Sequence, residues 1–298
     1  MVSRLISANT SEILNMTKEE LKQSIKASEG RVIVSEVAQN HEPIVGDISH
    51  AELSNAYGAD MILLNNIDLF NPQVWGVKDQ SNFVEELHHL VGCPIGVNLE
   101  PVDENADMAE DRDVISKGRQ LNKETLEVAE KMGLDFICLT GNPGTGVTNQ
   151  QIINALEITS KYFSGLVIAG KMHGSGVSEA VITKETVKAF VEAGADVILV
   201  PAVGTVPGFT DSELIEIVKY THEHDALVLS AIGTSQEGSQ SSVIEQFAIR
   251  NKVCGVDIQH IGDAAYGGIA PLENIYTLSK AIRGIRHTAS RMARSINR

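Results

Sequence analysis

The sequence is poor in residues that make covalent or metal cross-links. Its three cysteines are Cys93, Cys138 and Cys254, and none belongs to a CxxC pair or to a His/Cys spacing typical of zinc sites. Cys138 and Cys254 lie in apolar stretches typical of strands, so we expect both to be small core residues. These features exclude a zinc-binding module and indicate a reducing compartment.

The sequence also lacks a long apolar run and an excess of positive charge. The first 16 residues contain no apolar segment typical of a signal peptide, and no run approaches the ~18 apolar residues of a membrane span. We therefore expect a cytoplasmic protein without a membrane partner. The formal net charge of −15 disfavours a nucleic-acid-binding surface.

A recurring phrase is the main structural signal in the chain. It reads YGADMILLN at residues 57–65, MGLDFICLT at 132–140 and AGADVILVP at 193–201. In each copy, a glycine typical of a left-handed helix C-cap precedes an aspartate and a continuous apolar run, as expected for a parallel strand buried on both faces. Further apolar runs begin at residues 31, 94, 166, 227 and 253. Eight β/α units in 298 residues predict an α/β fold, a (β/α)8 TIM barrel, with a doubly wound open sheet as the alternative.

Short segments flank the predicted barrel of residues 31–284. Residues 1–30 are predicted to be a helical extension, in which Thr17 and Glu20 form a capping box. Residues 285–298 are predicted to be a basic helical tail. The last 16 residues carry five arginines and no acid, namely Arg283, Arg286, Arg291, Arg294 and Arg298. We interpret the tail as a solvated helix, with a binding arm or a helix docked on a second, acidic subunit as alternatives.

Polar residues near the carboxyl ends of the apolar runs are the candidates for chemistry, because these ends converge at the mouth of a barrel. Polar groups this deep in apolar runs cost free energy unless they are paired or functional. The candidates are Glu36, Asn65, Asn98, Glu100, Thr140, Lys171, His173, Ser230, Asp257 and Gln259. Strand alternation places Lys171 on the same side as His173. His260 has the opposite parity to Asp257 and is expected to face the helices.

Lys171, Glu36, Glu100 and His173 are the predicted catalytic residues. Lys171 directly follows VIAG, so its ammonium is expected to project toward the barrel mouth. There it could be a Schiff-base nucleophile or, as we favour, a cation that holds a carboxylate or phosphate. The structural alternative is an ion pair with Glu36 or Glu100. His173 is a candidate general acid or base, and Glu36 or Glu100 is expected to move a proton.

Three carboxylates also form a candidate metal site. Glu36, Glu100 and Asp257 could hold Mg²⁺ or Mn²⁺, because hard cations prefer oxygen ligands. No dense metal-binding motif accompanies them in the sequence, so the use of a metal stays open.

Two loops of small residues follow the last two predicted strands. In TIM barrels these loops commonly bind phosphate, since small residues let backbone N–H groups approach an anion. The predicted anion-binding residues are Gly233, Thr234, Ser235, Gly238 and Ser239 in the first loop and Gly262 and Asp263 in the second. Asp263 is expected to cap a helix or turn there, because a carboxylate is unfavourable beside phosphate. Asn65, Asn98 and Asp257 are the predicted substrate-binding residues at strand ends.

Three phrases carry a family resemblance: SANTSEILNMTKEELKQSIKASEGRVIVSEV near the start, MILLNNIDLFNPQVWG, and HIGDAAYGGIAPLENI near the end. They resemble a bacterial family of unknown function whose members are predicted barrels, often labelled phosphoenolpyruvate phosphonomutase-like or haloacid dehalogenase-like. The resemblance runs over nearly the whole chain and implies a barrel fold. PIGVNLEP and DFICLTGNPGTG also resemble the photosystem-biogenesis factor BtpA.

The sequence therefore predicts a TIM-barrel enzyme that acts on a small phosphorylated or otherwise anionic metabolite, by lyase (aldolase-like) or isomerase chemistry. One alternative is a barrel that binds a phosphorylated metabolite without turnover, as a sensor or assembly factor. A second alternative is a divalent-metal-dependent hydrolase. A homo-oligomer is expected, because most soluble oligomers are built from copies of one chain.

Overall fold

Eight parallel strands close into a barrel in the computed structural model, which describes residues 2–298. Neighbours along the chain are neighbours in the sheet, and β8 pairs with β1 to close it, so the predicted (β/α)8 barrel is confirmed. The strands are β1 (Val32–Ala38), β2 (Met61–Asn65), β3 (Ile95–Leu99), β4 (Phe136–Leu139), β5 (Leu166–Gly170), β6 (Val197–Pro201), β7 (Leu227–Ile232) and β8 (Ile258–Ile261).

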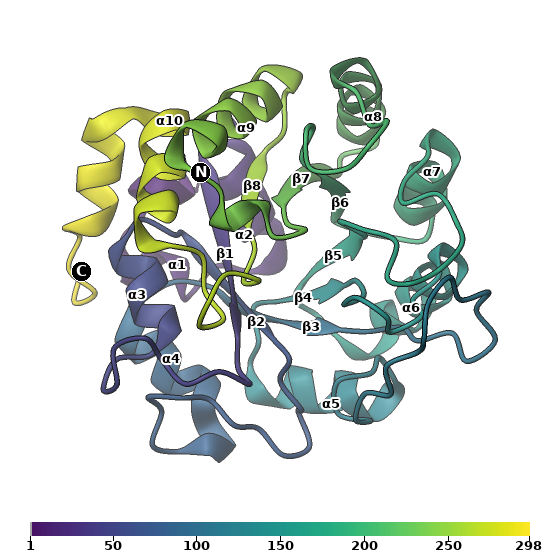
Figure 1. The fold of residues 1–298 in the computed structure, drawn as a ribbon. Coiled ribbons are helices and arrows are strands. Elements are labelled where there is room, and N and C mark those ends of the chain that lie inside the picture. Colours follow the sequence, from purple (N-terminus) through teal and green to yellow (C-terminus); the bar gives the residue numbers. More distant parts are fainter. Residues whose placement is uncertain (1) are drawn as a thin grey trace.

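Figure 1 shows these strands in the centre with the longer helices around them. The helices that follow the strands are α3 (His50–Ala56), α4 (Phe83–Val91), α5 (Lys123–Met132), α6 (Asn149–Tyr162), α7 (Lys184–Glu192), α8 (Asp211–Glu223), α9 (Ser241–Cys254) and α10 (Leu272–Met292). Cys254 is thus the last residue of a helix, and the prediction that it lies in a strand is wrong. The helix continues because its C-cap glycine is Gly255, three residues before β8 begins.

Two hydrophobic clusters account for the continuous apolar runs. Outward strand residues such as Ile33, Ile62 and Ile198 pack under the helices, whereas inward residues such as Val34 and Leu63 fill the barrel. Both faces of each strand are therefore buried, which is why alternation is weak in the sequence. The barrel interior is a packed core rather than a pore.

The amino-terminal segment packs against one end of the barrel interior. It comprises the short helix η1 (Leu5–Ser7), α1 (Thr10–Ile13) and α2 (Lys18–Lys26). Their apolar residues, including Leu5, Ile6 and Ile25, belong to the same cluster as Val32 and Leu166, the first residues of β1 and β5. The predicted Thr17–Glu20 capping box opens α2. With the amino-terminal end of the barrel covered, the opposite end is left for a binding site.

Four aspartates that follow the helix-ending glycines tie the strands together in pairs. The aspartates are Asp60, Asp135, Asp196 and Asp257, and their carboxylates accept hydrogen bonds of 2.9, 2.7, 3.0 and 2.8 Å from the N–H groups of Ile33, Ile95, Val167 and Val228, respectively. Each aspartate N–H also donates to the carbonyl of that same partner residue. The result is a closed double hydrogen bond between β1 and β2, β3 and β4, β5 and β6, and β7 and β8.

Each of these aspartates also faces a positively charged or titratable side chain from a different helix. The partners are Arg283 of α10 at 2.6 Å from Asp60, His88 of α4 at 2.7 Å from Asp135, Lys18 of α2 at 3.4 Å from Asp196, and His222 of α8 at 2.8 Å from Asp257. The prediction that Asp257 binds substrate or metal is therefore wrong. Asp257 precedes β8 and lies at the amino-terminal end of the barrel, because Gly255-Val256-Asp257 is a fourth copy of the recurring phrase.

The carboxyl-terminal helix returns to the start of the chain. A non-helical residue, Gly284, breaks α10, and beyond it Arg291 approaches Asp60 at 3.5 Å. The Arg298 carbonyl accepts a hydrogen bond from the Ser11 N–H at 2.9 Å. The interpretation of this basic segment as a solvated helix is wrong for Arg283 and Arg291, which are both buried beside Asp60.

The Asp60–Arg283 pair gives a first stability prediction. Both side chains are fully buried, so Asp60→Asn should cost about 3–5 kcal/mol, because it leaves the Arg283 charge uncompensated. Denaturant unfolding measures the loss. Asp225→Asn is the control: Asp225 pairs with Lys22 and Lys26, but its side chain is 81% exposed, so a change within about 0.5 kcal/mol is expected. Equal losses of unfolding free energy in the two variants would contradict a stabilising role for the buried Asp60–Arg283 pair.

A second prediction concerns pH. The hydrogen bond to Asp257 raises the pKa of His222 above its ordinary value. Protonated His222 therefore stabilises the fold below about pH 6.5, and this contribution is lost as the pH rises through the raised pKa. His222→Gln should lower the free energy of unfolding at pH 6 by on the order of 0.5 kcal/mol, because solvent screens this partly exposed pair, and by less at pH 9. His224→Gln is the control, since its ring contacts a backbone carbonyl. A constant difference between wild type and His222→Gln across this range would refute the assignment.

Candidate active site at the barrel mouth

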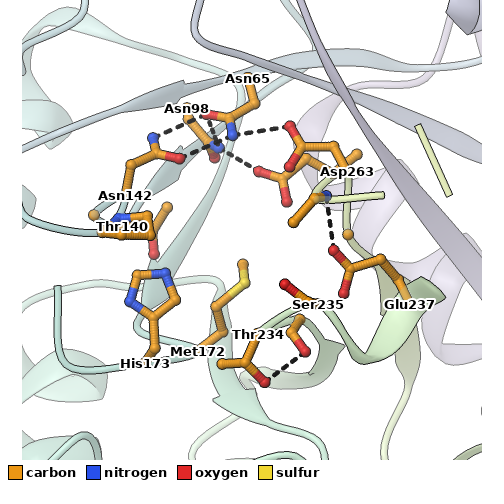
Figure 2. A pocket seen from close by; sticks show the side chains of 16 residues that line it. Asn65, Asn98, Thr140, Asn142, Met172, His173, Thr234, Ser235, Glu237 and Asp263 are labelled. Carbon is orange, nitrogen blue, oxygen red and sulfur yellow. Dashed lines mark hydrogen bonds between the residues drawn. The ribbon is translucent and has the colours of Figure 1, made fainter. Parts of the chain in front are cut away.

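A polar pocket of about 120 Å³ lies at the carboxyl-terminal end of the strands (Figure 2). Its walls come from the ends of β1, β2 and β3 and from the loops after β4, β5, β7 and β8. The lining residues are Glu36, Asn65, Asn98, Thr140, Gly141, Asn142, Pro143, Met172, His173, Gly233, Thr234, Ser235, Glu237, Gly262, Asp263 and Ala264. We call this space the mouth pocket.

Strand alternation explains why residues of β1, β2 and β3 line the mouth pocket. Along β1 the inward residues are Val32 and Val34, which pack in the barrel core, followed by Glu36 at the mouth. Asn65 on β2 and Asn98 on β3 occupy the corresponding inward positions. The last inward layer of the barrel is thus polar, and the structure brings these three predicted residues together.

Amide side chains connect the carboxylates of the pocket. Asn98 Nδ2 donates to Glu36 Oε1 at 2.6 Å and to Asn65 Oδ1 at 2.9 Å. Asn65 Nδ2 in turn donates to Asp263 Oδ2 at 3.0 Å. Asp263 therefore faces the pocket, and the expectation that it caps a helix or turn is wrong. The network fixes both carboxyl groups against one wall.

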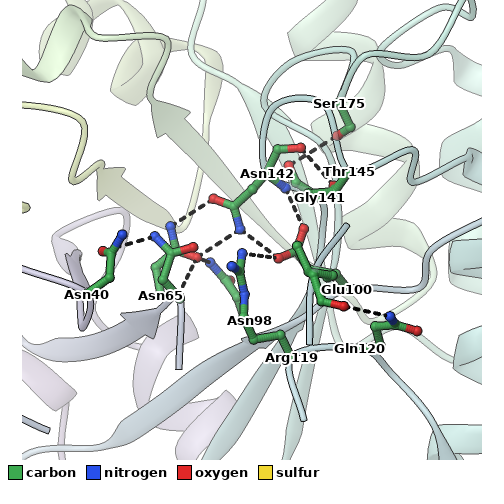
Figure 3. Close-up of polar contacts among 12 residues, drawn as sticks. Asn40, Asn65, Asn98, Glu100, Arg119, Gln120, Gly141, Asn142, Thr145 and Ser175 are labelled. Atoms are coloured by element: carbon green, nitrogen blue, oxygen red, sulfur yellow. Dashed lines mark hydrogen bonds and ion pairs between the residues drawn. The ribbon is translucent and has the colours of Figure 1, made fainter. Parts of the chain in front are cut away.

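Asn142 is a pocket residue that strand reasoning missed, because it lies in the loop after β4. Its Nδ2 donates to Asn65 Oδ1 at 3.0 Å and to Glu100 Oε1 at 2.9 Å (Figure 3). Its backbone N–H donates to Glu100 Oε2 at 2.8 Å. The signal in the sequence was the small-residue phrase TGNPGTG, which places an amide side chain directly after a strand.

Glu100 does not line the mouth pocket, so its predicted role in moving a proton is not supported by its position. Arg119 Nη2 donates to Glu100 Oε1 at 2.8 Å, and Asn142 donates one hydrogen bond to each Glu100 carboxylate oxygen. The chain leaves the regular strand after Leu99, and Glu100 turns toward the loop wall. Glu100 instead positions Asn142.

Lys171 also departs from its predicted place. Its side chain is fully buried, and Nζ donates to the Glu179 carboxylate and to the Val147 carbonyl at 3.3 Å. Burial lowers the pKa of Lys171, with Glu179 opposing the shift. Because β5 ends at Gly170, strand alternation no longer applies, and the next residue in the pocket wall is Met172. Lys171 is therefore part of an ion pair, with neither Glu36 nor Glu100 as its partner.

His173 lines the mouth pocket, as expected from its position beyond β5. Burial lowers the pKa of His173 below its ordinary value, so the imidazole is neutral at pH 7. His260, in contrast, was expected to face the helices, and this expectation is wrong. Its Nε2 lies 3.1 Å from Glu36 Oε2 inside the barrel, while Gln259 Nε2 donates outward to the Ala248 carbonyl. The parity was misassigned because β8 begins only at Ile258.

The loop after β7 contributes strained backbone to the pocket. Thr234 and Ser235 both have positive φ angles, of 58° and 68°, and both line the pocket. This conformation is unfavourable for a β-branched residue such as threonine, and such strain concentrates at functional sites. Gly238 lines an adjacent groove instead, and the Ser239 carbonyl accepts a hydrogen bond from Asn274 at 2.7 Å.

Glu237 is the second pocket residue that the sequence analysis missed. It is 1% exposed, and its Oε1 accepts a hydrogen bond of 2.7 Å from the Ala264 N–H, in the loop after β8. The backbone donor expected to bind a phosphate thus already binds a carboxylate of the same chain. Glu237 lies within the small-residue loop GTSQEGS, where an acid is the one residue unsuited to a phosphate site.

The pocket holds three carboxyl groups, and its lining contains no lysine or arginine. Burial, together with the nearby Glu36, raises the pKa of Asp263 well above its ordinary value. Burial likewise raises the pKa of Glu237. Buried, mutually repelling carboxyl groups do not all ionise together, so the pocket can hold both acids and a base.

Three residues that line the pocket each carry a buried polar side-chain atom without a hydrogen-bond partner in the described part of the chain. Thr140 Oγ1, Asn98 Oδ1 and Glu237 Oε2 are buried and have no hydrogen-bond partner among residues 2–298. Buried polar atoms without partners are rare and costly, at about 1–3 kcal/mol each. A ligand hydroxyl, which both donates and accepts, would match such atoms, whereas a ligand carbonyl would match only a donor such as the Thr140 hydroxyl.

The predicted metal ligands Glu36, Glu100 and Asp257 do not come together. Only Glu36 faces the mouth pocket, and Asp257 lies at the other end of the barrel. Within the described part of the chain, no group of three or more His, Cys, Asp or Glu side chains is arranged to hold a metal ion.

The fold and the site together define the class of this protein: it is a TIM barrel whose mouth is lined by carboxyl and amide groups. The chain belongs to a family described as a domain of unknown function, DUF7916, whose model matches residues 6–298. No curated protein is significantly similar to it. In the described residues, no helix is long and apolar enough to cross a membrane.

Two solved structures are similar to this chain. One is 2,3-dimethylmalate lyase, a member of the PEP mutase/isocitrate lyase superfamily, with 13% identity, a TM-score of 0.50, and coverage of 85% of this chain and 83% of that one. The other is a thiamine phosphate pyrophosphorylase from Pyrococcus furiosus, with 15% identity, a TM-score of 0.48, and coverage of 86% and 97%. The likeness to 2,3-dimethylmalate lyase establishes a shared fold alone, because the identity is low.

The raised pKa of Asp263 predicts a stability gain on its removal. The folded state holds a proton that the unfolded chain releases above about pH 3.9, so the native protein loses stability as pH rises through this window. Asp263→Asn should therefore be more stable than wild type at pH 8, with the difference shrinking toward pH 4. Thermal unfolding at several pH values measures it, with the exposed Asp111→Asn as control. A variant less stable than wild type at pH 8 would contradict this assignment.

Proposed function

We propose that this protein is an enzyme that catalyses proton-transfer chemistry, of lyase or isomerase type, on a small metabolite rich in hydroxyl and carbonyl groups. The observation that carries the proposal is the convergence of Glu36, Asp263 and Glu237 on one pocket. Two of these acids have raised pKa values. Sites that separate the protonation states of neighbouring carboxyl groups are suited to general acid–base catalysis.

Each carboxyl group has a role that fits its surroundings. Asp263 and Glu237 have raised pKa values, so they hold their protons to higher pH than ordinary carboxyl groups and are suited to donate them to a carbonyl or leaving hydroxyl oxygen. Glu36, held by Asn98 on one oxygen and beside His260 on the other, is the base that removes a proton from the substrate. Asn98 Oδ1 and Thr140 Oγ1 orient the substrate through hydrogen bonds.

The composition of the wall favours a neutral head group over a phosphate. The pocket lining carries no lysine or arginine, and Glu237 already occupies the Ala264 N–H. A phosphate in the same space would face the Glu36 carboxylate with no lysine or arginine in the lining to offset the repulsion, which costs free energy in a buried site.

Solvent hydrogen exchange tests the proposal across a range of compounds, so it does not depend on the identity of the substrate. The protein is incubated in D2O with a panel of hydroxy and keto compounds of up to about six non-hydrogen atoms, and deuterium uptake at carbon is followed by mass spectrometry. Glu36→Gln should lower the rate of uptake by about 10²–10⁴-fold, since loss of a general base costs that much. Parallel reactions with EDTA and with added Mg²⁺ test the use of a metal.

Glu124→Gln, an exposed acid in the first turn of α5, is the matched control and should exchange like wild type. If Glu36→Gln also exchanged like wild type, the base assignment would be wrong. If no compound exchanged hydrogen but one bound in the mouth pocket, the protein would be a binding protein without turnover, and the proposed enzymatic function would be wrong.

A further inference from the structure

A second space adjoins the mouth pocket beside the loop after β8. It is a groove with a volume of about 540 Å³, compared with about 120 Å³ for the mouth pocket. The groove is lined by Ile44, Ser235, Gly238, Ala264, Ala265, Tyr266, Ile269, Ala270 and Pro271. Ser235 and Ala264 also line the mouth pocket, so the two spaces share a wall. We call this second space the alanine groove.

The alanine groove has a different chemistry from the mouth pocket. None of its lining residues is charged, and most are alanine, glycine, isoleucine or proline. Two of its large side chains are open to solvent, with Ile44 50% exposed and Tyr266 104% exposed. An apolar surface with an exposed aromatic ring gains free energy when an apolar group covers it.

The sizes of the two spaces indicate how they are used. Ligand sites commonly measure about 300–1,000 Å³, and a cavity of roughly 150 Å³ is filled by benzene. The mouth pocket therefore holds a head group of about five or six non-hydrogen atoms. The rest of a metabolite of ordinary size must lie outside it, and the alanine groove is large enough to receive that part.

We propose that the substrate is amphipathic, with an oxygenated head in the mouth pocket and an alkyl or aryl tail in the alanine groove. The tail would extend from the head group past Ser235 and Ala264, the shared wall, and lie over Ala265 and Tyr266. This inference rests on the proposed function, because it takes the position of the head group from it. It adds the substrate class: a hydroxylated or carbonyl compound with an apolar chain or ring.

A competing groove exists on the other side of the mouth. It measures about 440 Å³ and includes His173, Gly174, Ile182, Phe209 and Glu213 in its lining. It shares only His173 with the mouth pocket, and it contains a charged side chain. The alanine groove shares two residues and has no charged lining residue, which makes it the better match for an apolar tail.

The test uses two vicinal diols that differ only in their tails, 1,2-propanediol and 1,2-octanediol. Binding is followed by NMR of methyl-labelled alanine and methionine. Met172 lines only the mouth pocket, and Ala265 and Ala270 line only the alanine groove, so their methyl groups report on the two spaces separately. Each methylene that becomes buried strengthens binding about fourfold. 1,2-Octanediol has five more methylenes, of which only some are covered, so it should bind at least about tenfold more tightly and shift the Ala265 and Ala270 methyls.

Two glycine variants distinguish the grooves. Gly238→Leu fills the alanine groove and Gly174→Leu fills the competing one. Neither glycine has a positive φ, and an added Cβ meets nothing closer than 3.8 Å at Gly238 and 3.5 Å at Gly174. Gly238→Leu should remove the advantage of 1,2-octanediol and keep the affinity for 1,2-propanediol. Gly174→Leu should keep both affinities.

The outcomes separate this proposal from the proposed function. Equal affinity of the two diols for wild type, or an octyl advantage lost only in Gly174→Leu, would overturn the tail assignment. If 1,2-octanediol shifts the alanine methyls in wild type but not in Gly238→Leu, the groove binds an apolar chain. In that case, a Met172 methyl that responds to neither diol means that the head-group assignment fails and the tail assignment stands.

Discussion

The barrel depends on a carboxylate that binds the backbone of the preceding strand. This interaction occurs at Asp60, Asp135, Asp196 and Asp257, which link the strands in four pairs. A helix-ending glycine with positive φ turns the chain so that the aspartate two residues later reaches the neighbouring N–H. The same four carboxylates attract side chains from α2, α4, α8 and α10. One short phrase thus aligns the strands and anchors the surrounding helices.

These stabilising ion pairs lie at the amino-terminal end of the barrel. The carboxyl-terminal end can therefore contain side chains and backbone that lower the stability of the fold. At the mouth, carboxyl groups are buried close together, backbone at Thr234 and Ser235 is strained, and polar atoms lack partners. Each of these features costs stability, and such costs are typical of sites shaped for ligands. The amino-terminal end of the barrel therefore stabilises the fold, whereas the carboxyl-terminal end provides the candidate site.

The sequence was sufficient to predict the barrel, because glycine followed by aspartate and a continuous apolar run marks each strand start strongly. Strand parity also placed Glu36, Asn65 and Asn98 at the mouth. It failed where a strand began or ended unexpectedly. Lys171 and Glu100 follow the last residues of their strands, so their side chains take directions set by loops. His260 was misplaced because Asp257 belongs to the turn before β8 rather than to the strand.

Loop residues were beyond the reach of periodicity. Asn142 and Glu237 enter the site through hydrogen bonds to Glu100 and the Ala264 N–H, partners 42 and 27 residues away. No local pattern encodes such contacts. The phosphate site stays a prediction. The small residues of the loop were interpreted as space for an anion, whereas Glu237 of the same loop binds the Ala264 N–H.

The distance along the chain between Asp60 and Arg283 has a consequence for synthesis. The two residues are 223 positions apart. The sheet likewise cannot close until β8 has been synthesised, because β8 pairs with β1. At a synthesis rate of about 5–20 residues per second, Asp60 exists for roughly 10–45 s before its cation leaves the ribosome. During this interval the nascent chain exposes unpaired strand edges at β1 and at its latest strand. Barrel closure is thus a late event that follows synthesis of β8. Until then, the unpaired strand edges are the part of the protein most exposed to aggregation and to chaperones.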